Sequence, residues 1–172
     1  MTTLVLTVIG GDRSGIVSSL ADVVARHDGN WDRSQIAELA GAFAGIIIVS
    51  VPADRTAALR ADLEALPDLT LAIHEADAAA VDEPTDHLSV ELLGNDRPGL
   101  VKELTAVFAA HGLSIEQFES GSFDAPMAGG RLFEALLVVP IGPDADLDAL
   151  RADLERLALE LMVDIAVRAQ DD

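Results

Sequence analysis

The chain has 172 residues, of which 11 are basic and 30 acidic, so its formal net charge at pH 7 is −19. A surface with this charge repels phosphate backbones and anionic headgroups, which excludes direct binding to nucleic acid or to a membrane. Apolar residues make up 50% of the chain, too much for a disordered acidic segment, and Cys is absent, which excludes disulfides, thiolate metal sites and cysteine nucleophiles. Neither a signal peptide nor an apolar run long enough to cross a membrane is visible, so we expect a soluble, cytoplasmic protein.

The first half of the chain predicts six elements in the order βαββαβ. An apolar face at positions 16, 17, 20, 23 and 24 indicates the first helix, and a nearly continuous apolar run ended by Pro52 is typical of a strand near the middle of a sheet. In chain order, the predicted elements are strand Leu4–Ile9, a helix from Ile16 to near Gly29, strands Trp31–Leu39 and Phe43–Val51, helix Ala53–Leu66, and strand Leu69–Glu75.

The second half repeats the first. The matching residues, each 84 positions apart, are Gly10 and Gly94, Asp12 and Asp96, Arg13 and Arg97, and Gly15 and Gly99. The hexapeptide Leu59–Glu64 recurs identically as Leu150–Glu155, 91 positions later, so seven residues have been added in between. Loops tolerate insertions, and we expect these residues in the Gly- and Pro-containing stretch Gly121–Arg131.

The repeat predicts two domains joined by a short linker. The first covers residues 1–77, a stretch of small, acidic and Pro residues forms the linker over 78–86, and the second domain covers 87–172. The order βαββαβ indicates an α+β, ferredoxin-like arrangement, with a four-stranded antiparallel sheet and both helices on one face. Because a module of this size has a small core, we expect the two copies to pack together.

The turn between the first strand and the first helix is the candidate ligand-binding element in both copies. It ends at a helix N-terminus, whose unpaired amides and dipole favour an anionic group such as a carboxylate. Asp12 or Asp96 could cap the helix, and Pro98 fits a first helical position. The alternative interpretation is that both segments are only good turns that start helices.

The motif Asp-Arg-Pro-Gly-Leu-Val at positions 96–101, and its variant Asp-Arg-Ser-Gly-Ile-Val at 12–17, resemble the ACT domain, a small regulatory module that binds amino acids. Two such modules alone resemble the glycine cleavage system transcriptional repressor and its relatives. The resemblance implies that the modules pair as a pseudo-dimer, with their sheets side by side in one antiparallel eight-stranded sheet and the helices on one face.

The resemblance also implies a ligand at the domain interface, bound by the turn and by the start of the second strand. Carried over by position, the site residues are Gly11, Asp12, Arg13, Ser14, Gly15, Asn30 and Trp31 in the first copy, and Asn95, Asp96, Arg97, Pro98, Gly99, Ser114 and Ile115 in the second. Ser14 replaces the usual Pro, and the bulky Trp31 is expected to narrow or fill the first site. The second copy keeps the motif intact and is favoured, with Arg97 and the helix amides offering a place for a carboxylate.

No pattern indicates a catalytic residue, a metal or a cofactor. The turn lacks both the Gly-x-Gly-x-x-Gly order and the Walker ending of nucleotide-binding loops, and the chain lacks a Gly-x-Ser-x-Gly elbow. His27 and His111 are predicted to lie at the ends of the first helices, where a structural role is favoured over metal binding. The alternation of Asp144, Asp146 and Asp148 is typical of a helix start rather than of a Ca²⁺ loop.

These features favour a non-catalytic regulatory protein. By the resemblance, a small amino acid such as glycine or serine binds and changes how the chain meets a protein partner such as a transcription factor, in transcriptional control of amino-acid metabolism, and the chain can form homo-oligomers. One alternative is an ACT pair without ligand that serves as a scaffold or oligomerisation module. Another is an enzyme, since formyltetrahydrofolate deformylase has a similar opening, but that likeness covers only the first module.

Overall fold

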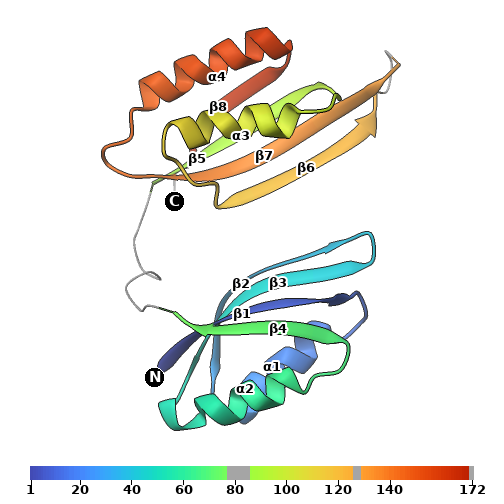
Figure 1. Cartoon of the computed structure of the whole chain (residues 1–172), viewed down its shortest axis with the longest axis vertical. Helices are drawn as coiled ribbons and strands as arrows, with labels where there is room; N and C mark the ends of the chain where they lie inside the picture. Colours follow the sequence, from blue (N-terminus) through green and yellow to red (C-terminus); the bar gives the residue numbers. More distant parts are fainter. Residues whose placement is uncertain (77–85, 126–128, 171–172) are drawn as a thin grey trace. The chain divides into compact units, whose positions relative to one another are not determined.

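The computed structural model describes residues 1–76, 86–125 and 129–170, and the chain divides into two compact units, 1–83 and 84–172. Most of the predicted linker lies outside the described residues. Its last residue, Asp86, already begins a strand. Each unit is a βαββαβ module, as the sequence predicts (Figure 1).

The two modules have the same series of elements. The first contains β1 (Thr2–Gly11), α1 (Ile16–Arg26), β2 (Asn30–Leu39), β3 (Ala42–Val51), the short 3₁₀ helix η1 (Ala53–Arg55), α2 (Thr56–Glu64) and β4 (Leu69–Glu75). The second contains β5 (Asp86–Asn95), α3 (Leu100–Ala110), β6 (Gln117–Asp124), β7 (Arg131–Ile141), α4 (Leu147–Leu161) and β8 (Asp164–Gln170). The helix predicted over Ala53–Leu66 therefore starts as a 3₁₀ turn and ends two residues early.

Each module has one antiparallel four-stranded sheet, in the order β2-β3-β1-β4 in the first and β6-β7-β5-β8 in the second. The apolar strand β3 lies inside its sheet, between β2 and β1, as predicted. Both helices of a module cover the same face of its sheet (Figure 1), so the ferredoxin-like prediction is confirmed. The joining of the two sheets into one of eight strands stays a prediction.

Each module has its own hydrophobic core between helices and sheet. In the first module, alternate β1 residues are fully buried, and α1 contributes Ile16, Leu20, Val23 and Val24. Val17 is 43% exposed, contrary to the predicted apolar face. Among the described residues, none of the helices is long and apolar enough to span a bilayer.

Most of the predicted insertion lies in the β6–β7 hairpin. Val49 pairs with Leu4 and Val139 with Leu88, so the offset between the copies has grown from 84 to 90 by β7. Six of the seven added residues therefore lengthen this hairpin, inside the predicted stretch, and the seventh lies between β7 and α4. The longer hairpin stands next to the turn after β5, since Asp96 N–H donates to the Arg131 carbonyl oxygen at 2.8 Å.

Candidate ligand site

The two strand-to-helix turns are held in place by loops that lie far away in the sequence. In the first module, the Asp12 N–H donates to the Gly41 carbonyl oxygen at 2.8 Å, and the Arg13 guanidinium donates to the Pro67 carbonyl oxygen at 3.4 Å. The β2–β3 hairpin and the α2–β4 loop therefore both support this turn. In the second module, Arg131 supports the equivalent turn, and its Nε lies 3.7 Å from Asp96 Oδ2.

The first glycine of each motif permits close packing. A Cβ atom on Gly10 would lie 2.7 Å from the Asp68 carbonyl oxygen, and one on Gly94 would lie 2.2 Å from Val163 Cγ1. Both distances are shorter than van der Waals contact. These glycines let the end of the first strand pass directly beside the loop before the last strand, so their recurrence has a steric cause.

The last glycine of each motif is the N-cap of the following helix. Gly15 has φ 88° and Gly99 has φ 96°, in the left-handed region that favours glycine. Each N-cap is a glycine, which has no side chain to accept from the helix amides, so the predicted capping by Asp12 or Asp96 is wrong, and Pro98 precedes the N-cap rather than starting the helix. The amides of the first helical turn have no intrahelical acceptors and can receive an anion.

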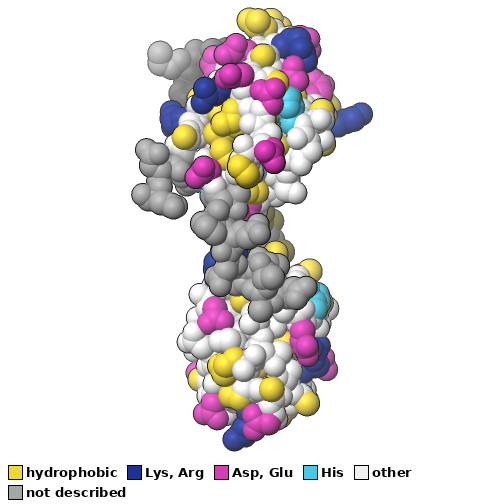
Figure 2. Space-filling view, turned by 90° about the vertical axis from the view of Figure 1, so that its left-hand side faces the viewer, with side chains coloured by type: hydrophobic (Ala, Val, Ile, Leu, Met, Phe, Trp, Pro, Cys, Tyr) yellow, Lys and Arg dark blue, Asp and Glu magenta, His cyan; other side chains and the backbone are white. Residues whose placement is uncertain are grey.

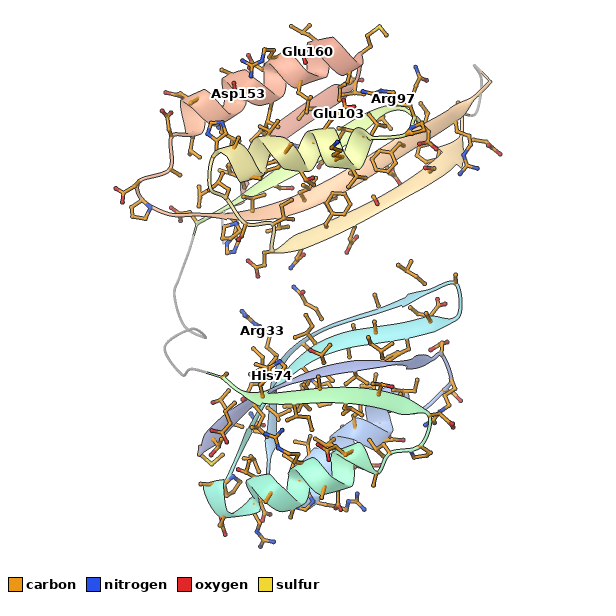
Figure 3. All side chains as sticks on the ribbon, in the orientation of Figure 1. Arg33, His74, Arg97, Glu103, Asp153 and Glu160 are labelled. Carbon is orange, nitrogen blue, oxygen red and sulfur yellow. The ribbon has the colours of Figure 1, made fainter. Side chains whose placement is uncertain are left out.

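The arginine of the second turn already has an anionic partner. Arg97 donates two hydrogen bonds to Glu103 on α3, from Nη1 to Oε1 at 3.1 Å and from Nη2 to Oε2 at 2.7 Å (Figure 3). These hydrogen bonds raise the pKa of Arg97 and lower the pKa of Glu103, so both groups are charged at neutral pH. Arg97 is therefore paired within its own module, and its role toward a ligand carboxylate stays a prediction.

A hollow of about 530 Å³ lies beside the second turn. Its lining comprises Asp96, Arg97, Gly99, Leu100, Val101, Lys102, Ser122 and Phe133. Ser122 and Phe133 are not among the predicted site residues, because they come from β6 and β7 and no local pattern places those strands beside the turn.

The predicted residues at the start of the second strand lie at the other end of the module. Trp31 pairs with Val49, which pairs with Leu4, and Leu4 is seven residues before Gly11 on β1. At ~3.3 Å per residue, this places Trp31 about 23 Å from the turn of its own module. Trp31 packs against the core of the first module and does not narrow that turn.

Asn30 and the second-copy residues show the same separation. Asn30 pairs with Ser50 at the far end of β3, and its side chain donates to Asp32. Ser114 and Ile115 precede β6, which begins at Gln117. Within one module, the structure thus does not bring the turn and the start of the second strand together, and a site that combines them at the domain interface stays a prediction.

A pair of matched hydrogen bonds links the helices of each module. His27 Nε2 lies 2.9 Å from Asp62 Oδ2, and His111 Nε2 lies 2.9 Å from Asp153 Oδ2. Both histidines are the C-caps of their helices, as predicted. The sequence carried a signal for the pairing, since both Asp residues belong to the repeated hexapeptide.

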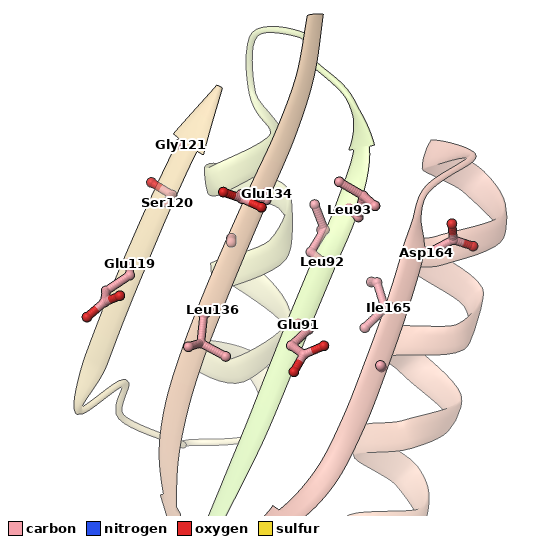
Figure 4. A pocket seen from close by; sticks show the side chains of 12 residues that line it. Glu91, Leu92, Leu93, Glu119, Ser120, Gly121, Glu134, Leu136, Asp164 and Ile165 are labelled. Carbon is pink, nitrogen blue, oxygen red and sulfur yellow. The ribbon is translucent and has the colours of Figure 1, made fainter. Parts of the chain in front are cut away.

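A second, larger hollow of about 720 Å³ lies on the sheet face of the second module that carries no helix (Figure 4). Four carboxylates contribute to its lining, from Glu91, Glu119, Glu134 and Asp164. Arg168 neutralises one of them, since its Nη1 lies 2.6 Å from Glu91 Oε1. Among the described residues, no three His, Asp or Glu side chains are close enough to hold a metal ion.

Acidic side chains elsewhere follow the helix pattern that the sequence predicts. Asp146 is the N-cap of α4, and its carboxylate accepts from the Ala149 N–H at 3.0 Å. Figure 2 shows Asp and Glu side chains scattered over the visible surface of both modules, with Lys and Arg among them. The acidic charge is therefore dispersed on this face rather than gathered into one patch.

Comparisons with known proteins agree with this fold. An unknown protein from Galdieria sulphuraria is similar over 99% of both chains, at 30% identity with a TM-score of 0.88. A candidate glycine cleavage system transcriptional repressor is 18% identical, over 99% of this chain and 98% of that one, with a TM-score of 0.73, which shows a shared fold. No curated protein matches this chain. Models of the ACT domain match residues 2–82 and 88–158, and the chain therefore belongs to the ACT domain family, with two such domains in tandem.

Proposed function

We propose that this chain is a non-catalytic regulatory protein that binds a small amino acid, such as glycine or serine, at its ACT turns. Ligand binding changes how the chain interacts with a protein partner such as a transcription factor, and this interaction controls amino-acid metabolism. The observation that carries the proposal is the recurrence of one turn in the same place of both modules. Each turn leads into a helix N-terminus that has no side-chain cap. The fold similarity to the candidate repressor supports the regulatory part.

The first-module turn offers the chemistry that an amino acid needs. The ligand carboxylate accepts hydrogen bonds from the amides at the start of α1, where the helix dipole favours negative charge. Nothing lies within 4 Å of a Cβ built on Gly15, so the space beside the cap is open. Arg13 and Asp12, in the same turn, supply one positive and one negative charge, which suits a zwitterion.

Isothermal titration of the full chain against the twenty standard amino acids tests the proposal. We expect saturable heats for glycine, serine or another small amino acid, and about tenfold weaker binding for Arg13→Met, since a charge-assisted contact is lost. Arg151→Met is the matched control, because this exposed arginine lies on α4 and has the same charge. Twenty flat titrations would remove the sensor function.

A ligand-free ACT scaffold is the second candidate. It is favoured by the structural roles of the motif residues, since Gly10 and Gly94 are required for packing and Arg97 is already paired within its module. In that case the titrations are flat, and the chain assembles in sedimentation experiments without any amino acid.

A further inference from the structure

The two turns differ at one position of the first helix turn. Glu103 on α3 corresponds by the 84-residue repeat to Ser19 on α1. Both residues donate the first helical hydrogen bond to the capping glycine, at 3.0 Å for Glu103 and 2.9 Å for Ser19. The backbones are thus equivalent, and only the side chains differ.

The Ser19 side chain turns back onto its own helix. Its hydroxyl donates to the Gly15 carbonyl oxygen at 2.8 Å, and this leaves the space around the cap empty. Arg13, the arginine of this turn, donates to a backbone carbonyl oxygen, that of Pro67. The first helix therefore has no carboxylate at the position equivalent to Glu103.

The Glu103 side chain instead reaches over the N-terminus of α3. Its Oε1 lies 3.3 Å from the position of a Cβ built on Gly99, and both of its oxygens accept from Arg97. A protein carboxylate thus holds the guanidinium and stands next to the cap, where a ligand carboxylate would bind. Because Glu103 is part of the chain, it competes at an effective concentration of about millimolar or more.

We infer that Glu103 is an autoinhibitory carboxylate that closes the second-module turn to carboxylate ligands, so that the first module is the binding one. This inference rests on the proposed function, because it concerns the same kind of site. It reverses the preference that motif completeness gave to the second copy. The intact motif there is occupied by the chain's own acid, and the variant motif with Ser14 is the open one.

Acetate, the simplest carboxylate, tests the inference without knowledge of the natural ligand. The backbone amides of residues 16–18 and 100–102 are followed by NMR during an acetate titration of the full chain. In the native protein, we expect residues 16–18 to respond at an acetate concentration at least tenfold lower than residues 100–102, because Glu103 must be displaced. The side-chain signal of Arg151 serves as the control for nonspecific association.

Substitutions of Glu103 and Ser19 test the role of these side chains directly. Glu103→Gln keeps the size of the side chain but removes its charge, and Glu103→Ser copies the first module. Both variants should bring the response of residues 100–102 to within about threefold of that of residues 16–18. The reciprocal Ser19→Glu should weaken the response of residues 16–18 by about tenfold.

The inference is overturned if residues 100–102 of the native protein respond as readily as residues 16–18. It is also overturned if both Glu103 variants leave residues 100–102 unresponsive, or if neither turn responds to acetate in any variant. Flat titrations with all twenty amino acids, alongside the expected acetate pattern, would instead refute the proposed sensor function and leave the role of Glu103 intact.

Discussion

The first glycine of each motif can be tested as a packing residue by adding a single methyl group. Gly10 and Gly11 are adjacent at the end of β1, and neither has a positive φ, so alanine is conformationally allowed at both positions. A Cβ on Gly10 meets the Asp68 carbonyl oxygen and Leu69 Cδ2, both at 2.7 Å, whereas one on Gly11 has nothing within 4 Å. Gly11→Ala is therefore the matched control.

The expected difference is large for a small domain. At a compatible position, Gly→Ala stabilises by about 0.4–1 kcal/mol, because the unfolded chain loses conformational freedom. Overpacking against a backbone oxygen, which cannot move aside alone, costs about 1–3 kcal/mol. The first effect applies to both variants and cancels, so we expect Gly10→Ala to be less stable than Gly11→Ala by about 1–3 kcal/mol in free energy of unfolding.

Urea unfolding monitored by tryptophan fluorescence measures this difference in the first module. The chain has one Trp and no Tyr, and Trp31 packs against the core of that module, so the signal reports the first module. Equal unfolding midpoints for Gly10→Ala and Gly11→Ala would refute the close approach.

The second module allows the same reasoning to be checked by rescue. A Cβ on Gly94 would lie 2.2 Å from Cγ1 and 2.8 Å from Cβ of Val163. Because these atoms belong to a side chain, Val163→Ala should restore part of the stability that Gly94→Ala loses. We expect a coupling energy of about 1–3 kcal/mol in a double-mutant cycle, and additive effects would contradict the contact.

Two further predictions concern stability. A hydrogen bond from His111 lowers the pKa of Asp153 from 3.8, so this carboxylate stabilises the fold above that pH and the contribution is lost as the pH falls through the lowered pKa. Between pH 5 and pH 2, the melting temperature of Asp153→Asn should therefore fall less than that of the native chain or of Asp148→Asn, and parallel curves would contradict this. Met162, the C-cap of α4, is 86% exposed and has φ 54°, so Met162→Gly should raise the free energy of unfolding by about 1 kcal/mol, measured by urea unfolding followed by circular dichroism. An unchanged midpoint would show that the left-handed cap is not strained.

The internal repeat predicts more of this structure than any other feature of the sequence. The 84-residue offset predicted two modules, and the hydrophobic periods predicted the order of their elements, because strands and helices bury side chains at different spacings. The same repeat contained a signal for the His–Asp pairs, since each His and each Asp recurs. It also showed that Ser19 in the first copy is replaced by Glu103 in the second. The consequence of this difference depends on the direction of the side chain, which the sequence does not give.

The candidate site stays a prediction, because the resemblance placed the turn and the start of the second strand together at the interface between the modules. Within one module β1 and β2 run in the same direction, so their starts lie at one end of the sheet and the turn lies at the other. The predicted role of Asp12 was wrong. The helix begins only at Ile16, after the left-handed Gly15, which puts Asp12 too far back to cap it.

The sequence by itself determined the tandem βαββαβ architecture, the antiparallel class of the sheets and the turn that recurs in both modules. These depend on periodicity and on turn residues, which act over a few positions. Only the tertiary structure decided what the motif residues touch. Gly10 meets a loop 58 residues away, and Arg97 meets an acid on the next helix. Such contacts depend on how the folded segments pack against one another, and local sequence patterns do not predict that packing.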